Sequence, residues 1–411
     1  MDVAGFIANR IAFNRQNSFS RFIIRLSVGA TVVSVAVMIV TLALVNGFQE
    51  TVSNKVFSFS GHIRVQFKQA LSGPVTEEIP IERNPNAEAA IKNDSRVKSM
   101  HPYATRYAIL KAADAMEGVL LKGLDKEFDV NLIKPFLKEG RWINFNDSSY
   151  SREIIVSVYT AKQLQVKLND KLLIYFIRPD GTLRPDKLEI VGIYKTGIDD
   201  YDKQISIGDL RLIRRLNDWK ENEIGGYEVF LHDFDKMEKT SEDLYALPAF
   251  PETWDTQPIR SIYPNIFDWL NLQNLTRNVL IGFMVLVAVI NLITCLIILV
   301  LERIRMVGVL KALGATDWTV QKIFLRHSII ITLVGIFFGV ILGLGLLYLQ
   351  KATGFIKLKE EAYYMSEAAV KIVWWQVLLV CAFTFLVSLL ILMIPTYIVK
   401  KVKPVKAIQF R

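Results

Sequence analysis

The chain has 411 residues, of which 52% are hydrophobic and 22% are charged, and its formal net charge is +9. This composition is too apolar for one ordinary soluble domain and indicates several membrane-spanning helices together with a folded part outside the membrane. The two cysteines, Cys295 and Cys381, lie inside apolar runs, which excludes a structural disulfide bond in a domain outside the membrane.

Four apolar runs are long enough to cross a hydrocarbon core of about 30 Å as helices. None of them contains Asp, Glu, Lys or Arg, and they cover residues 26–48, 279–301, 328–349 and 373–399. The first run is longer than the apolar core of a typical signal peptide, and no small-residue cleavage site follows it. We therefore expect it to be retained as a membrane anchor.

Basic residues are concentrated in three short segments beside the apolar runs. Residues 1–26 contain four basic residues and one acidic residue. Residues 302–326 contain five basic and two acidic residues, and residues 400–411 contain five basic residues and no acidic residue. The long block 50–267 has 30 basic and 33 acidic residues. By the positive-inside rule, the three short segments are cytoplasmic and the block lies on the other side of the membrane. Such juxtamembrane charge favours contact with lipids, and no nucleic-acid partner is expected.

Residues 50–267 mix strand-like and helical patterns, which predicts an α+β domain of about 200 residues. The strand-like runs cover residues 61–67, 117–124, 153–158, 171–177, 187–195 and 227–231. The helical patterns cover residues 87–94, 160–164, 208–216 and 234–244.

The stretch RPDGTLRPD (178–186) connects two of these predicted strands. Asp180 and Gly181 favour a turn, and the two prolines are expected to stop the strand ladder, so the stretch predicts a protruding hairpin tip. The tip is either a solvated turn or a docking finger for a partner. The second interpretation rests on three basic residues that lie together, Arg178, Arg184 and Lys187.

No catalytic residues are predicted. The sequence has no Gly-x-Ser-x-Gly, His-Glu-x-x-His or Cys-x-x-Cys motif and no phosphate-binding loop, so the chain is not expected to be an enzyme or to hydrolyse ATP unaided. No metal site is predicted, because the histidines lack the spacing of metal ligands. We interpret each histidine as a surface or capped residue: His62, His101, His232 and His327.

The apolar runs contain small and uncharged polar residues that suit helix packing. Gly335, Gly339 and Gly343 are four residues apart, which lets two helix backbones approach closely. Asn291 and Thr294 can be satisfied within a helix bundle. Because no span contains an acid or a base, an ion-coupled carrier is not favoured, and the energy for transport must come from elsewhere.

The segment between the second and third runs predicts two short helical pieces. An apolar stripe ends at Gly314, which can form a left-handed cap, and Thr316 is a suitable N-cap for the next helix. Periodicity alone leaves two interpretations open, a helix that lies in the membrane interface and a helix that docks on a partner. The stripe consists of Met306, Val309, Leu310 and Leu313.

Five stretches resemble the permease subunits of lipoprotein-releasing (Lol-type) ABC transporters, a branch of the MacB/FtsX-like permease family. They are LVNGFQETVSNKVFSFSGHI (44–63), EIVGIYKTGIDDYD (189–202), NVLIGFMVLVAVINLITCLIILVLERIRMVGVLKALGAT (278–316), IKLKEEAYYMSEAAVKI (356–372) and KPVKAIQFR (403–411). The resemblance covers all four apolar runs and the segments that connect them, in the same order.

The resemblance implies an α-helical membrane protein with four transmembrane helices plus a large extracytoplasmic α+β domain, the MacB-like periplasmic core domain. It implies the inner membrane as the location, with both chain ends cytoplasmic. The expected parts are a cytoplasmic amphipathic N-terminal segment (1–25), transmembrane helix 1 (26–48), the periplasmic domain (49–267), transmembrane helix 2 with its outer extension (268–301), a cytoplasmic coupling-helix region (302–327), transmembrane helix 3 (328–349), a periplasmic loop (350–372), transmembrane helix 4 (373–399) and a cytoplasmic tail (400–411).

The resemblance also implies partners. Two permease chains pair with a homodimer of cytoplasmic ABC ATPase subunits, which bind ATP and Mg, so this chain itself is expected to need no cofactor. The implied cargo is a lipid-anchored protein, a lipoprotein, that is passed to a periplasmic carrier. The sequence leaves open whether the second permease chain is a copy of this one or a paralogue.

Three groups of residues receive roles from the resemblance. The coupling helix would dock in a groove of the ATPase through Glu302, Arg303, Arg305, Met306, Val309, Leu310, Leu313 and Gly314. A cavity for acyl chains would be lined by Val45, Phe48, Val52, Ile266 and Leu270, although ordinary packing between spans explains these residues equally well. A hook for the carrier would comprise Arg178, Pro179, Asp180, Gly181, Arg184 and Lys187.

Three alternatives are less favoured. A MacB-like exporter usually has its ATPase fused at the N-terminus, where only about 25 residues precede the first span here. An FtsX-like regulator of periplasmic hydrolases usually has a smaller outer domain. A membrane receptor with an extracytoplasmic sensor domain would need a larger cytoplasmic output module than this sequence offers.

Overall fold

The computed structural model of the protein describes two compact units, which we call the helix unit and the sheet unit. The described residues are 19–68, 78–113, 115–145, 149–177, 182–302 and 304–400. The helix unit comprises Met1–Gln49, Leu270–Lys357 and Glu367–Arg411, and the sheet unit comprises Glu50–Trp269 and Leu358–Ser366.

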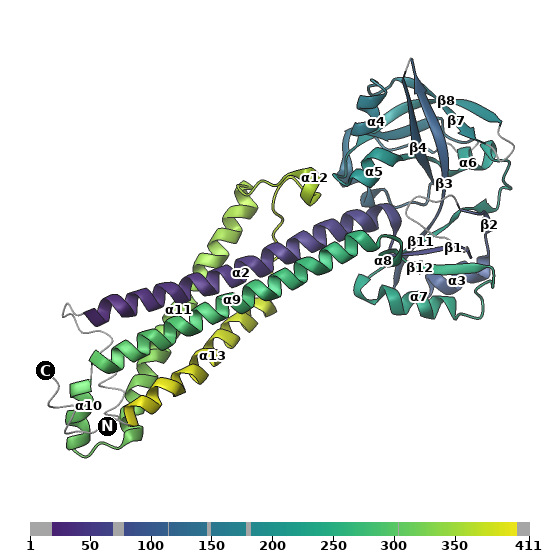
Figure 1. Ribbon diagram of the computed structural model, residues 1–411. Coiled ribbons are helices and arrows are strands. Elements are labelled where there is room, and N and C mark those ends of the chain that lie inside the picture. Colours follow the sequence, from purple (N-terminus) through teal and green to yellow (C-terminus); the bar gives the residue numbers. More distant parts are fainter. Residues whose placement is uncertain are drawn as a thin grey trace. The chain divides into compact units, whose positions relative to one another are not determined.

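Long apolar helices form the helix unit (Figure 1). In the described residues, three helices are long and apolar enough to cross a membrane, Arg25–Ser60, Pro264–Thr294 and Asp317–Thr353, while the apolar part of the last helix, Trp374–Leu390, is shorter. The helices are α2 (Phe19–Ser60), α9 (Pro264–Glu302), α10 (Ile304–Ala312), α11 (Asp317–Thr353) and α13 (Trp374–Lys400).

Helix α2 is a single helix of 42 residues that continues past the apolar run 26–48. No proline or glycine lies between Phe48 and Ser60 to interrupt it. It ends at Gly61, whose φ of +67° is a left-handed conformation that favours glycine.

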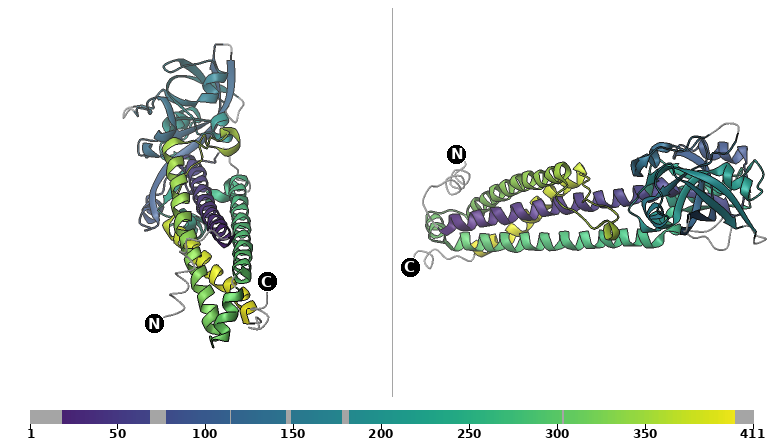
Figure 2. Two further views of the ribbon diagram at one scale, coloured as in Figure 1. Left: turned by 90° about the vertical axis from the view of Figure 1, so that its left-hand side faces the viewer. Right: turned by 90° about the horizontal axis from the view of Figure 1, so that it is seen from above.

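Helices α2 and α9 run side by side in opposite directions within the helix unit (Figure 2). Near one end, Gln49 Nε2 donates a hydrogen bond of 3.1 Å to the carbonyl oxygen of Leu270. Near the other end, Asn291 Nδ2 donates to the carbonyl oxygen and to Oγ of Ser27, each at 3.2 Å. Asn291 is therefore satisfied inside the helix unit, as the sequence predicts.

A shared apolar core joins α2, α11 and α13. Its buried members come from all three helices, and residues of α9 pack against it at the edge. The core comprises Val35, Met38, Ile39, Ala43, Ile336, Leu347, Val377 and Val380.

The sheet unit is built on a mixed sheet in which six strands close on themselves. Strand β3 pairs with β4, β4 with β9, β9 with β6, β6 with β8, β8 with β7, and β7 pairs back with β3. Three further strands continue outward from β3 in the order β11, β1 and β12. Leu110, Ile174 and Phe176 are fully buried, so large apolar side chains fill the inside of the closed strands.

The strands of the described sheet unit are β1 (Ile63–Phe67), β2 (Ile81–Glu82), β3 (Val97–Ala112), β4 (Ala115–Leu124), β5 (Leu137–Gly140), β6 (Glu153–Ser157), β7 (Lys171–Ile177), β8 (Leu183–Tyr194), β9 (Ile205–Asp209), β10 (Glu223–Ile224), β11 (Gly226–Leu231) and β12 (Trp254–Pro258). The helices are α3 (Pro85–Lys92), α4 (Val158–Gln163), α5 (Asp199–Gln204), α6 (Leu210–Leu216), α7 (Met237–Tyr245), α8 (Ile259–Ile262) and α12 (Glu360–Tyr363), with short 3₁₀ turns η1 (Val130–Leu132), η2 (Lys134–Phe136) and η3 (Phe234–Lys236).

The six predicted strands and the four predicted helices are confirmed within a few residues at their ends. Three substantial strands were not predicted, namely β3, β9 and β12. The prediction that both prolines of the 178–186 stretch stop the ladder is wrong for Pro185, which pairs with Tyr175. In the described residues no second strand pairs with β8 at this point, so the missing amide hydrogen of the proline is tolerated.

The interpretation of the histidines as surface or capped residues is wrong for two of them. His62 is 9% exposed and His101 is 7% exposed. His62 Nδ1 accepts a hydrogen bond of 2.8 Å from the backbone N–H of Leu231, so the buried ring is partnered within the sheet. Among the described residues, no group of three or more His, Cys, Asp or Glu side chains could hold a metal ion.

Candidate functional site

A row of apolar side chains on α10 and at its C-terminal end is partly exposed. Val309 is 49% exposed and Leu313 is 80% exposed, and Met306 and Leu310 are half-buried. We call these four residues the α10 stripe. The other side of the helix is packed, since Val307 is fully buried.

The end of α10 is fixed by backbone hydrogen bonds. Gly314 has a φ of +90°. The N–H of Gly314 donates a hydrogen bond of 3.1 Å to the carbonyl oxygen of Lys311, and the N–H of Ala315 donates one of 2.9 Å to the carbonyl oxygen of Leu310. This is a Schellman cap, which satisfies helix carbonyl groups and turns the chain sharply.

The following helix, α11, begins at once and is tied to α10. Thr316 is its N-cap, and its side chain accepts a hydrogen bond from the N–H of Thr319. The Lys311 ammonium lies 2.8 Å from the Asp317 carboxylate, and the Lys311 side chain is only 9% exposed. The α10 stripe is thus presented by a short helix that is held at a set angle to α11.

The polar residues predicted beside the stripe are only partly described. Glu302 is the last residue of α9, and Arg305 lies in the first turn of α10. Arg303 lies outside the described residues.

The predicted lining of a lipid-anchor cavity is largely buried by the chain itself. Val45 and Phe48 of α2 are half-buried in the helix unit, and Leu270 of α9 is 5% exposed. In the sheet unit, Val52 is fully buried and Ile266 is 7% exposed. This burial is what ordinary packing along α2 and α9 produces.

Helix α9 has a broad apolar face that the sequence pattern did not single out. Its exposed residues recur at spacings of three and four, so they lie on one side of the helix. They are Leu272, Leu275, Val279, Phe283, Leu286 and Ile290, each between 48% and 61% exposed.

Three glycines of α11 lie against α2. A Cβ atom at Gly335 would lie 2.8 Å from the side chain of Thr31, and one at Gly339 would lie 2.8 Å from that of Val35. A Cβ atom at Gly343 would lie 3.2 Å from the backbone of Ala36. The absence of a side chain at these positions lets the two helices approach closely.

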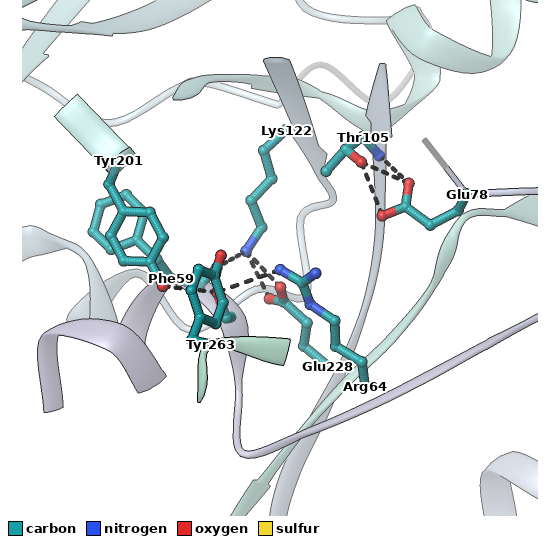
Figure 3. Close-up of polar contacts among 9 residues, drawn as sticks. Phe59, Arg64, Glu78, Thr105, Lys122, Tyr201, Glu228 and Tyr263 are labelled. Carbon is teal, nitrogen blue, oxygen red and sulfur yellow. Dashed lines mark hydrogen bonds and ion pairs between the residues drawn. The ribbon is translucent and has the colours of Figure 1, made fainter. Parts of the chain in front are cut away.

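A cluster of buried charged and aromatic residues surrounds the last turn of α2 in the sheet unit (Figure 3). Lys122 of β4 and Glu228 of β11 form an ion pair with distances of 2.7 and 2.8 Å, and their side chains are 2% and 0% exposed. Lys122 Nζ also donates to the carbonyl oxygen of Phe59 in α2. Burial lowers the pKa of Lys122, and the Glu228 carboxylate opposes part of this change.

A second cation of the cluster, Arg64 of β1, reaches the same helix end. Its Nη2 donates to Ser60 Oγ at 3.3 Å, and its Cα lies opposite that of Glu228 in the sheet register. Ser60 Oγ is also 3.1 Å from the hydroxyl of Tyr201, and the ring of Phe59 stacks on that of Tyr201 with centroids 5.3 Å apart.

The fourth charge is Glu78, which is buried beside Thr105 of β3. Its carboxylate accepts hydrogen bonds from Thr105 N at 2.8 Å and from Thr105 Oγ1 at 2.7 and 2.8 Å. Burial raises the pKa of Glu78, while the bonds from Thr105 and the charge of Arg64 act in the opposite direction. Side chains from β1 and β4 therefore hold the end of α2 through charge-assisted bonds, and Glu228 of β11 pairs with Lys122 of β4. Such bonds are stronger and more directional than neutral ones.

The predicted hook residues lie at the β7–β8 hairpin. Arg178, Pro179, Asp180 and Gly181 lie outside the described residues. Arg184 does not point freely into solvent, because it lies 2.9 Å from the Asp218 carboxylate and donates to the carbonyl oxygen of Arg215 at 3.0 Å. Lys187 is exposed.

Comparisons with known proteins identify two family matches that together cover most of the chain. The model of the MacB-like periplasmic core domain matches residues 26–246, and that of the FtsX-like permease C-terminal part matches residues 278–404.

Curated relatives match over almost their whole length. The chain is 20% identical to LolC of Xylella fastidiosa (strain Temecula1), over 96% of both chains. It is 22% identical to LolE of Haemophilus influenzae, over 99% of both chains, and 22% identical to LolC of Neisseria meningitidis serogroup B, over 96% of both chains. Each relative is named as a lipoprotein-releasing system transmembrane protein.

Two solved structures of outer domains are also similar. The extracellular domain of the ABC-type transporter YknZ from Gram-positive bacteria covers 47% of this chain and 98% of its own, with 16% identity and a TM-score of 0.33. The periplasmic region of MacB from Actinobacillus actinomycetemcomitans covers 51% of this chain and 95% of its own, with 12% identity and a TM-score of 0.33.

Proposed function

The chain belongs to the permease family that combines a MacB-like periplasmic core domain with an FtsX-like permease part, and on that premise we propose that it is the permease subunit of a lipoprotein-releasing ABC transporter. The observation that supports the proposal best is the alignment with lipoprotein-releasing permeases over 96% to 99% of both chains. A match of this extent includes the membrane helices, the outer domain and the segments that connect them.

The energy source is a separate ATPase. The sequence has no phosphate-binding loop, so ATP and Mg are bound by a cytoplasmic ABC ATPase homodimer that docks on the α10 stripe. The stripe suits this role because Val309 and Leu313 are exposed on a helix whose angle to α11 is fixed. In helix-in-groove docking, an apolar row on one side of a helix is buried in a groove of the partner.

Four helices span the inner membrane, with both chain ends cytoplasmic and the sheet unit periplasmic. Helix α13 has 27 residues, and at about 1.5 Å per residue it is long enough to cross a hydrocarbon core of about 30 Å. Trp374 and Trp375, at its start, are 59% and 62% exposed. Tryptophan at a helix end is typical of the membrane interface.

A second permease chain covers the exposed face of α9. Among the described residues, six apolar side chains on one side of α9 are each between 48% and 61% exposed, so lipid or another membrane helix covers them in the bilayer. A second permease chain also gives the ATPase dimer a matching pair of docking helices.

The cargo is a lipoprotein, whose acyl chains must leave the bilayer. Extraction costs about 0.8 kcal/mol for each CH₂ group removed from lipid, so the acyl chains need both ATP hydrolysis and an apolar receiving surface. We assign that surface to the α2 and α9 helices, around Val45 and Phe48, which are half-buried.

The β7–β8 hairpin engages a periplasmic lipoprotein carrier. Support comes from the start of β8, where Arg184 is held by the Asp218 carboxylate and the Arg215 carbonyl oxygen. Replacing residues 179–181 with a short Gly-Ser linker should abolish retention of the chain on the immobilised carrier. Undiminished retention would contradict the hook assignment.

The function is tested by reconstituting the chain with its ATPase and a triacylated lipoprotein in proteoliposomes. We expect ATP-dependent transfer of the lipoprotein to a soluble carrier, and a Leu310→Asp variant should lose both ATPase copurification and transfer. The matched control is Met116→Asp, a substitution at a 60% exposed position of the sheet unit, which should leave both unchanged. Absence of transfer with the unaltered chain would overturn the proposal in favour of an exporter, a regulator or a receptor.

A further inference from the structure

Two of the stretches that the sequence singled out, 189–202 and 356–372, meet within the sheet unit. The Lys195 ammonium, just after β8, lies 2.5 Å from Oε2 of Glu360, the first residue of α12. Their side chains are 39% and 32% exposed. Because residues 358–366 lie in the loop between α11 and α13, this pair fastens that loop to the sheet unit.

The turn that presents Lys195 is built to receive Glu360. Asp202 accepts hydrogen bonds from Thr196 N and Thr196 Oγ1, each at 2.8 Å, and from Gly197 N at 2.9 Å. Gly197 has a φ of +78°, and a Cβ atom there would lie 2.7 Å from Glu360 Oε1. The left-handed φ therefore favours glycine in this turn, and a side chain at this position would displace the Glu360 carboxylate.

A lysine of α2 joins the same two segments. Lys55 Nζ donates to the carbonyl oxygen of Thr196 and to that of Tyr364 at 2.5 Å. The ring of Tyr364 makes an edge-to-face contact with Trp269 of α9, with centroids 5.4 Å apart. Four parts of the chain thus meet at one point, namely α2, α9, the turn after β8 and the loop between α11 and α13.

We propose that residues 358–366 form a latch, closed by the Lys195–Glu360 ion pair and by Lys55, that makes cargo release depend on ATP hydrolysis. This inference rests on the proposed function and names positioning residues for it. In chain order, α2 and α9 continue directly into the sheet unit, and residues 358–366 of the sheet unit lie between α11 and α13. Through the latch, a movement of α11 and α13 is transmitted directly to the strands of the sheet unit.

The contacts suit a transmitting role better than a role in folding. Both members of the ion pair are about one third exposed, and ion pairs this accessible to water contribute little to folding stability. A cavity of about 550 Å³ adjoins the pair and is lined by Lys162, Lys203 and Glu360 among others. The ion pair therefore borders open space on this side.

The test uses the complete transporter in proteoliposomes and measures lipoprotein released per ATP hydrolysed. Glu360→Lys and Lys195→Glu should each retain ATP hydrolysis but lower this ratio at least about fivefold, the lower end of typical coupling between sites. The double variant that exchanges both charges should recover most of the ratio. The matched control is Lys220→Glu, which breaks an exposed ion pair with Glu82 elsewhere in the sheet unit and should leave the ratio unchanged.

An unchanged ratio in both single variants would overturn the latch, as would a double variant no better than either single one. If Glu360→Lys impairs folding, judged by thermal unfolding, Glu360→Gln removes the charge with little change of shape and decides the question by the same ratio. Failure of the unaltered transporter to release lipoprotein would instead refute the proposed function, so the two failures are distinguishable.

Discussion

Removing either member of the buried Lys122–Glu228 ion pair should destabilise the sheet unit strongly. The side chains are 2% and 0% exposed, so a single substitution leaves a buried charge without its partner, which typically costs about 3 to 5 kcal/mol. Lys122→Met leaves Glu228 opposite Arg64 in the sheet register, which predicts a loss of about 3 kcal/mol. Glu228→Leu leaves Lys122 and Arg64 together as buried cations, which predicts a loss of about 5 kcal/mol.

The double variant Lys122→Met and Glu228→Leu should be less destabilised than the sum of the single variants, because no member of this pair remains charged. For a unit of this size, about 1 kcal/mol shifts the melting temperature by about 2 to 4 °C. The single variants should therefore melt about 10 and 15 °C lower than the unaltered chain. The measurement is thermal unfolding of the full chain in detergent, followed by tryptophan fluorescence.

The matched control is Lys203→Met, which breaks a pair with Asp199 whose side chains are 48% and 55% exposed. Such a pair contributes at most about 1 kcal/mol, so the control should melt within a few degrees of the unaltered chain. Single variants that behave like this control, or a double variant whose loss equals the sum of the single losses, would refute the reasoning.

Acidification should destabilise the sheet unit through His62, because burial lowers the pKa of its ring to about 4, with a smaller contribution from Lys98. The unfolded chain binds this proton at a higher pH than the folded chain, so stability should fall by about 3 kcal/mol between pH 6.5 and pH 4. His62→Gln should reduce this dependence in unfolding measurements across that range, and an equal slope would contradict the assignment. Gly339→Ala should destabilise the helix unit by about 1 to 3 kcal/mol, since its Cβ would lie 2.8 Å from Val35. Gly345→Ala, where nothing lies within 4 Å, is the control and should not lower the melting temperature in detergent; equal losses would count against close packing.

The periodicity of apolar residues predicts those helices and strands whose sequence pattern is clear within a few consecutive residues. Strands such as β6 and β7 are short apolar or alternating runs, and the α10 stripe follows the helical repeat. The longest strand, β3, was missed because Pro102 interrupts its sequence and its polar residues follow no strict alternation. Strand β9 was missed because its last two residues, Gly208 and Asp209, were assigned to the helix that follows.

The buried ion cluster could not be predicted from one sequence. Lys122 and Glu228 each stand within an apolar strand, where a lone charge is usually read as one that faces solvent. Only the pairing of β3 with both β4 and β11 brings the two residues together across 106 positions of the chain. The sequence shows only that Lys122 follows three large apolar residues and that Glu228 stands between Tyr227 and Val229.

The proline at position 185 has a consequence for what can approach the β7–β8 hairpin. Its neighbours Leu183 and Lys187 are exposed, and in the described residues no second strand covers this margin of β8. An exposed strand edge can pair with an extended peptide from another molecule and can promote aggregation, but proline and lysine at the edge disfavour both. The proline and the lysine therefore disfavour pairing of this edge of β8 with a strand of another molecule.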